Sequence, residues 1–136
     1  MRPEDSINIA KEDIPARIDT PDAVARHQPA FGDSTDYGPL AAEYFTLAEG
    51  TDITALLDGL EDDRCQSPHW GYIVSGTLTV TYSDGSEEVD TTGDMFYWPP
   101  GHTLRADADT DFVLFSPQHE HGEVIEQIRT NMDRST

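Results

Sequence analysis

Alternating polar and apolar residues form the clearest pattern in the middle of the chain. Residues 77–82 run Thr-Leu-Thr-Val-Thr-Tyr, a period of two that is typical of a half-buried strand. Other β-rich runs occupy residues 42–48, 70–75, 87–91, 95–98, 103–106 and 111–115, and residues 53–57 form a further short strand or an irregular apolar segment. Turn-forming residues separate these runs. The pattern predicts an all-β fold of seven to nine strands, an antiparallel sandwich or barrel of jelly-roll type.

The pattern changes after residue 118. Val124, Ile125, Ile128 and Met132 recur at intervals of three and four residues, which predicts an amphipathic C-terminal helix of about three turns. We expect its apolar side to pack across a face or an end of the barrel.

The N-terminal third carries weaker signals. Residues 1–18 are polar and acidic, and we expect an extended arm there. Thr20-Pro21-Asp22 resembles a helix start, with a hydroxyl at the N-cap and proline at the first helical position. The sequence therefore predicts a short helix that Pro29 ends, with His27 near its C-terminus as a partner for the helix dipole. Residues 28–40 are expected to be loop.

A length of 136 residues fits one domain. We expect residues 1–40 to form the arm, short helix and loop, residues 41–118 the barrel, and residues 119–136 the C-terminal helix and tail of that same domain.

Charge narrows the choice of partners. The chain has 27 acidic and 8 basic residues, a net charge of −19. Such a surface repels phosphate backbones and anionic lipids, so we expect neither nucleic-acid nor membrane binding. Solubility is the simplest explanation of the acidity, and attraction of cationic ligands is the alternative.

The cysteine content and the N-terminal sequence indicate the cellular compartment. Cys65 is the single cysteine, so no internal disulfide can form. The first residues lack the basic and apolar regions of a signal peptide, and no apolar run is long enough to span a bilayer. We expect a cytoplasmic protein.

Two glycine-anchored motifs, each with one histidine, stand out within the β-rich region. The first is Pro68-His69-Trp70-Gly71-Tyr72 with Gly76, and the second is Gly93-Asp94 followed by Pro99-Pro100-Gly101-His102-Thr103. Over residues 42–116 this arrangement resembles the cupin superfamily, in a divergent subgroup of small single-domain proteins. The resemblance implies a jelly-roll barrel and often a homodimer. Several cupins are metal-dependent enzymes, and others bind sugars or effectors.

The metal-binding positions of the cupin pattern are altered here. Counting from the motif glycines, the glutamate position is His69, and the two histidine positions of the first motif fall on Asp63 and Cys65. The histidine position of the second motif is Leu104, with His102 two residues earlier.

A replacement metal site is the main chemical hypothesis. Asp63, Cys65, His69 and His102 are all legitimate ligand types, and imidazole with thiolate suits zinc, iron, nickel or copper. Equally plain alternatives are a buried Cys65 that only packs, a His69 hydrogen-bonded to a carbonyl, and a solvated Asp63. His119 and His121 form a weaker candidate pair, because side chains two apart on a helix do not face each other.

A nucleophilic Cys65 with His69 as its base is a different hypothesis. On an extended strand the two residues would be about 13 Å apart, so the chain would have to bend, for which Pro68 is suited. Nearby carboxylates would raise the thiol pKa and oppose this chemistry.

A ligand pocket inside the barrel is expected to include Tyr44, Ile73, Tyr97 and Leu104. Alternation predicts that Tyr97 and Trp98 face opposite sides, and that Trp70 and Tyr72 point outward when His69 points inward.

The leading hypothesis is a cupin-type protein that binds a small organic molecule in the barrel through a non-standard metal centre, with metal-dependent catalysis left open. A metal-free binding or sensor protein and a structural dimerisation module are the alternatives.

Overall fold

The computed structural model describes residues 6–34 and 38–135, with backbone alone for residues 119–123 and 133–135. This part of the chain forms nine strands, one α-helix and short 3-10 turns. The strands are β1 (Ala16–Asp19), β2 (Ala23–Gln28), β3 (Leu40–Leu47), β4 (His69–Ser75), β5 (Thr77–Tyr82), β6 (Glu87–Thr91), β7 (Met95–Trp98), β8 (His102–Ala106) and β9 (Thr110–Pro117). The helix is α1 (Gln118–Ser135), and the 3-10 turns are η1 (Lys11–Asp13), η3 (Thr54–Leu57) and η4 (Glu61–Asp63).

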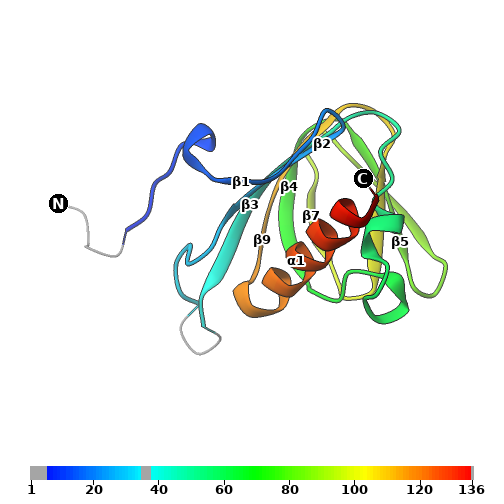
Figure 1. Cartoon of the computed structure of the whole chain (residues 1–136). Helices are drawn as coiled ribbons and strands as arrows, with labels where there is room; N and C mark the ends of the chain where they lie inside the picture. The colour runs from blue at the N-terminus through cyan, green and yellow to red at the C-terminus, as the bar shows by residue number, and fades with distance from the viewer. Residues whose placement is uncertain (1–5, 35–37, 136) are drawn as a thin grey trace.

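The strands make two antiparallel sheets that face each other (Figure 1). The larger sheet has the order β1-β2-β3-β9-β4-β7, and the smaller has the order β6-β5-β8. Nine strands confirm the predicted jelly-roll class, and β5, β6 and β7 have the predicted bounds. The segment at 53–57 is not a strand, because η3 occupies residues 54–57. No helix among the described residues is long and apolar enough to cross a membrane.

Inward-facing residues of both sheets make the main core. Alternate positions on each strand contribute to it, as the pleat requires. Its buried members are Leu47, Ile73, Leu78, Val80, Phe96, Trp98, Leu104, Ala106, Phe112 and Leu114. A second cluster lies where α1 meets the barrel and η3, and its buried members are Ile18, Ala25, Leu57, Cys65, Val124 and Ile128. The C-terminal helix is thus confirmed, and its apolar side covers part of the barrel.

The predicted N-terminal helix is wrong. Residues 16–28 form the β1–β2 hairpin instead, and they extend the larger sheet beyond β3. The Thr20 hydroxyl does accept the Ala23 N–H, at 3.0 Å, as a helix cap would, but the Thr20 N–H also donates to the Ala23 carbonyl at 2.9 Å. The same local chemistry therefore closes a hairpin turn, because pairing of β2 with β3 supplies hydrogen bonds to the backbone that follows.

Two motif glycines allow parts of the sheets to approach closely. Gly76 joins β4 to β5 with φ +107°, and a Cβ there would lie 2.5 Å from the Asp109 carbonyl oxygen. Gly71 has no unusual φ, but its Cβ would lie 2.2 Å from the Val113 carbonyl oxygen and 2.4 Å from Phe96 Cζ. Position 71 therefore tolerates no side chain unless β4 shifts relative to β9.

We expect Gly71→Ala to destabilise the protein by about 3 kcal/mol, because the added methyl group overpacks against backbone that is held in a ladder. Urea unfolding followed by circular dichroism measures the change. Val89→Ala, at a strand position that is 64% exposed, is the control and should stay within about 0.5 kcal/mol of the wild type. Equal stability of the two variants would contradict the close approach at Gly71.

Candidate metal centre and ligand cavity

Cys65, His69 and His102 meet at one end of the barrel. One potential ligand atom from each residue lies within 4.8 Å of the other two, and all three side chains are buried. His69 begins β4 and His102 begins β8. Cys65 precedes β4 and pairs with the start of β8, since its N–H donates to the His102 carbonyl at 2.8 Å and its carbonyl accepts the Gly101 N–H at 2.8 Å.

Hydrogen bonds orient both imidazole rings. His102 Nδ1 lies 2.8 Å from the Pro99 carbonyl oxygen, which can only accept, so Nδ1 carries a proton and Nε2 is the nitrogen that could bind a metal. His69 Nδ1 bonds the buried Ser116 hydroxyl, and His69 Nε2 lies 3.4 Å from Cys65 Sγ. Partners of this kind on the outer ring nitrogen are what metal-binding histidines ordinarily have.

The Cys65 thiol is strongly held in its protonated form. Its pKa is raised to about 12: burial is the largest cause, the negative charge of Glu43 adds to the increase, and a hydrogen bond with the Ser67 backbone partly offsets it. The direction agrees with the one expected from nearby carboxylates, but burial is the larger cause. In the absence of a cation, this cysteine is a neutral thiol at physiological pH.

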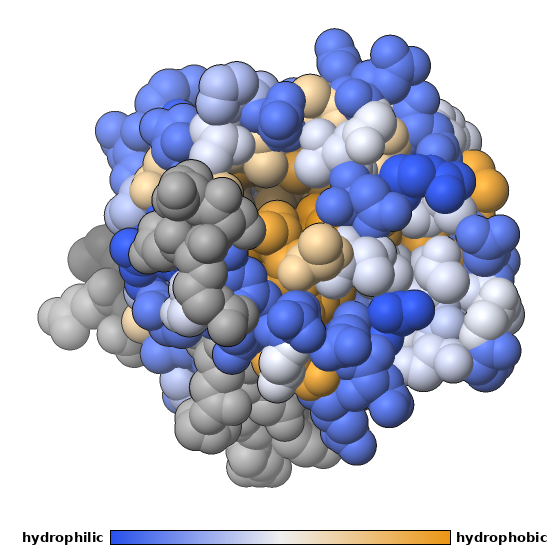
Figure 2. Space-filling model, turned by 45° about the vertical axis from the view of Figure 1, so that its right-hand side comes forward, coloured by the Kyte–Doolittle hydropathy of each residue, from blue (hydrophilic) through white to orange (hydrophobic). Residues whose placement is uncertain are grey.

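A cavity of about 50 Å³ adjoins the three donor residues. Apart from Cys65, His69, Trp98 and His102, its described lining residues are all aliphatic or phenylalanine. They come from both sheets, from η3 and from α1. Trp98 is one wall, and its indole N–H donates to Asp90 at 2.8 Å, where burial raises the pKa of the carboxyl to about 6. Figure 2 shows a hollow with hydrophobic residues at its floor and hydrophilic residues around it.

Asp63 is the predicted ligand that the structure places elsewhere. Its side chain is exposed on η4, and its carboxylate accepts the Gly59 N–H at 3.2 Å. Two facts explain the separation: Cys65 turns inward onto β8, whereas residues 61–63 form a 3-10 turn on the surface. The side chains of His119 and His121 lie outside the described residues.

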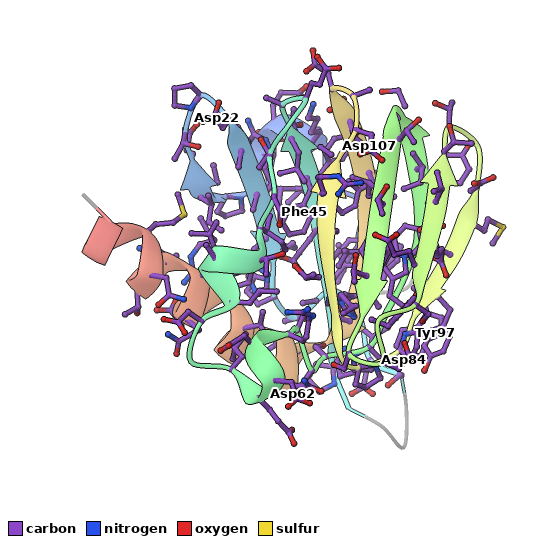
Figure 3. All side chains as sticks on the ribbon, turned by 90° about the vertical axis from the view of Figure 1, so that its right-hand side faces the viewer. Asp22, Phe45, Asp62, Asp84, Tyr97 and Asp107 are labelled. Carbon is purple, nitrogen blue, oxygen red and sulfur yellow. The ribbon has the colours of Figure 1, made fainter. Side chains whose placement is uncertain are left out.

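Of the four predicted pocket residues, Leu104 lines the cavity. Ile73 is fully buried in the main core but is not part of the cavity wall. Tyr44 faces outward, with the Lys11 ammonium 4.4 Å from its ring centroid. Tyr97 is 51% exposed and belongs to β7, an edge strand of the larger sheet. Figure 3 shows its side chain on the outside of the barrel.

Strand alternation accounts for these positions. Tyr97 and Trp98 lie on opposite sides as predicted, but Trp98 is the inward one and the pocket prediction had chosen Tyr97. Trp70 and Tyr72 are about half exposed, which confirms their predicted outward facing. Tyr44 was predicted to line the pocket, but on β3 it is the neighbouring Phe45 whose side chain points inward. Phe45 lines the cavity between the two sheets (Figure 3).

A buried histidine–carboxylate pair was missed by the sequence analysis. His27 Nδ1 lies 3.4 Å from a Glu43 carboxylate oxygen, and both residues are at least 95% buried. His27 belongs to β2 rather than to a helix terminus, which corrects the role predicted for it. The signal was available: Glu43 shares inward parity with Phe45 and Leu47, so β3 carries a carboxyl group into the interior.

Comparison with known proteins rests on structure. No family model and no curated protein matches the sequence. Similar solved structures include ectoine synthase from P. lautus, with 17% identity, a TM-score of 0.57 and coverage of 83% of this chain and 78% of that one. An RmlC-like cupin from Shewanella frigidimarina has 18% identity and a TM-score of 0.57, covering 83% and 92%.

The S161A mutant of Bacillus subtilis oxalate decarboxylase has 19% identity and a TM-score of 0.57, covering 85% of this chain and 32% of that larger one. At identities this low, the structural similarity shows the fold alone, and one fold can serve many functions. With its two antiparallel sheets and its motif glycines at the turns, the chain has the cupin fold.

Proposed function

We propose that this protein binds a transition metal ion through Cys65, His69 and His102 and uses that centre to bind a small organic molecule in the barrel. The observation that supports the proposal is the meeting of three buried donor side chains beside an otherwise apolar cavity. All three residues have hydrogen-bond partners within the protein, and a transition metal ion is a further partner that their donor atoms could share.

The donor set fits a borderline or soft metal. Two imidazoles and one thiolate suit zinc or copper, and iron or nickel are further options, whereas magnesium and calcium prefer oxygen ligands. Three protein ligands leave a coordination position for water or a small molecule, as in catalytic zinc sites. A bound cation would also favour the thiolate form of Cys65, whose pKa is otherwise raised.

A nucleophilic cysteine is the second candidate function, and one distance favours it. Cys65 Sγ lies 3.4 Å from His69 Nε2, so the chain does bend between residues 65 and 69. The raised thiol pKa argues against this candidate, because the thiolate is the reactive species. Metal binding is therefore the better-supported role. If no metal binds, we expect a metal-free binding protein whose histidines contact the ligand directly.

We further propose that the protein forms a homodimer through the outer surface of β4, β7 and β9. The exposed apolar side chains of this aromatic face are Trp70, Tyr72, Val74, Met95, Tyr97 and Phe115. The paired registers of the three strands bring them together, and the Trp70 and Tyr97 rings stack at 5.3 Å between centroids.

Area and charge both favour a second copy of the chain as the occupant of the aromatic face. An aromatic side chain carries about 150–250 Å², so these residues leave on the order of 500 Å² uncovered, a large part of the roughly 800 Å² per partner of a stable interface. Asp111 is the one acidic residue among the outward positions of these strands, all of which the structure describes. Two chains of charge −19 can approach each other only where carboxylates are scarce.

Metal binding can be tested on protein purified without an affinity tag. We expect about one equivalent of cobalt(II) to bind and to produce a thiolate-to-cobalt absorption band. His69→Ala and His102→Ala should each weaken binding by at least about 100-fold, since each removes a ligand. Asp63→Asn, an exposed acid two residues from Cys65, is the matched control and should change nothing. Less than a tenth of an equivalent, unaltered by His69→Ala, would overturn the metal proposal.

Thiol reactivity separates the two roles of Cys65. The rise in pKa from 9.0 to about 12 predicts about 10³-fold less thiolate at pH 8 in the metal-free fold than in the unfolded chain. Iodoacetamide should therefore modify native protein at least 10³-fold more slowly than protein in urea, as measured by mass spectrometry. Native alkylation at the rate of the unfolded chain would favour the nucleophile instead.

The dimer is tested by light scattering at micromolar concentration. We expect the wild type to be dimeric, with added salt favouring association because it screens the like charges. Trp70→Glu and Tyr97→Glu should give monomers, while Val89→Glu, on an exposed strand position of the other sheet, should not. A monomeric wild type in both low and high salt would refute the proposed interface.

A further inference from the structure

We infer that the natural ligand of the cavity has one polar donor group and an apolar body of a few non-hydrogen atoms. The inference rests on the proposed function, because the donor group is placed at Cys65, His69 and His102. It names the chemical class of the ligand, and it excludes sugars, dicarboxylates and zwitterions.

Polar groups are confined to one end of the cavity. Beyond Cys65, His69, His102 and Trp98, its described lining residues offer no side-chain oxygen or nitrogen. The indole N–H of Trp98 is already bonded to Asp90. A second polar group on a ligand would therefore lose its water without finding a partner, which is strongly unfavourable in a buried site.

Apolar residues from η3 and α1 make one wall of the cavity. Leu57 and Ile125 are 0% and 1% exposed, and both line the cavity. Asn131 ties α1 to η3, since its buried amide donates to the Leu56 carbonyl at 2.7 Å and to the Asp58 carbonyl at 2.8 Å. The polar groups of this contact are thus satisfied within the protein, and the ligand meets hydrocarbon there.

Charge and volume narrow the class further. The described lining contains no Arg or Lys to balance an anionic tail, so a second negative charge would be buried without a partner. A cationic tail would be repelled by a metal ion at the donors. A volume of about 50 Å³ is a third of the roughly 150 Å³ that admits benzene, which limits the ligand to roughly two to four non-hydrogen atoms.

The cobalt-loaded protein tests the ligand class with two probes of equal size. Propane-1-thiol and 2-mercaptoethanol share the thiol head and differ by a methyl group in place of a hydroxyl group. We expect propane-1-thiol to bind at least about tenfold more tightly, measured by the change in the visible cobalt spectrum, because the hydroxyl has no partner in the cavity. Leu104→Gln, which introduces an amide into the wall, should reduce this preference, and Val89→Gln should not.

Xenon binding to the metal-free protein is an independent test of whether the cavity accepts an apolar molecule. Xenon should shift the methyl resonances of Leu104 and Ile125 in NMR spectra, and leave the exposed Val89 methyls unshifted. Cobalt binding without a preference between the two thiols, or xenon without an effect on the cavity methyls, would overturn the ligand class while leaving the metal centre intact. Failure of cobalt to bind would instead refute the proposed function, and xenon would still decide whether the cavity accepts an apolar molecule.

Discussion

The pairing of Cys65 with the start of β8 is the contact on which the candidate site depends. Two backbone hydrogen bonds of 2.8 Å join Cys65 to Gly101 and His102. They place the thiol beside the His102 ring and direct the chain back across the barrel to His69 on β4. Segment 58–67 is largely polar, and these two hydrogen bonds are what hold its Cys65 side chain in the interior. The cysteine thus links the edge of the smaller sheet to a strand of the larger one.

Buried polar groups around the site are arranged in a consistent way. Pro99 and Ser116 bond the outer nitrogens of the two histidine rings, so the inner nitrogens face the thiol. Burial keeps that thiol protonated in the metal-free protein. A metal ion bound at the proposed site would displace the thiol proton, which would couple metal affinity to pH.

Both faces of β4, β7 and β9 are apolar, which is unexpected for so acidic a chain. The chain has 27 acidic residues and 8 basic ones, yet the cavity beside the donors is lined by hydrocarbon and the outer side of β4, β7 and β9 is aromatic. Strand alternation produces both surfaces at once: His69 faces the cavity and its neighbour Trp70 faces the proposed partner. The proposed ligand site and the proposed self-association face therefore share one short strand, so a substitution at one is expected to affect the other.

Local pattern by itself determined most of the barrel, because facing along a strand follows from a period of two and the glycine-rich turns need special backbone. It placed β5, β6 and β7, the outward facing of Trp70 and Tyr72, and three of the residues that meet at the site. Tertiary structure decided the remainder. Thr20 and its neighbours satisfy a helix start or a hairpin turn equally well, and only pairing with β3 chose the hairpin. Asp63 and Cys65 share parity on an extended chain, but a 3-10 turn at one and a bridge to β8 at the other sent them to opposite environments. Contacts between segments far apart in sequence carry no local signal, and it is those contacts that select which donors meet.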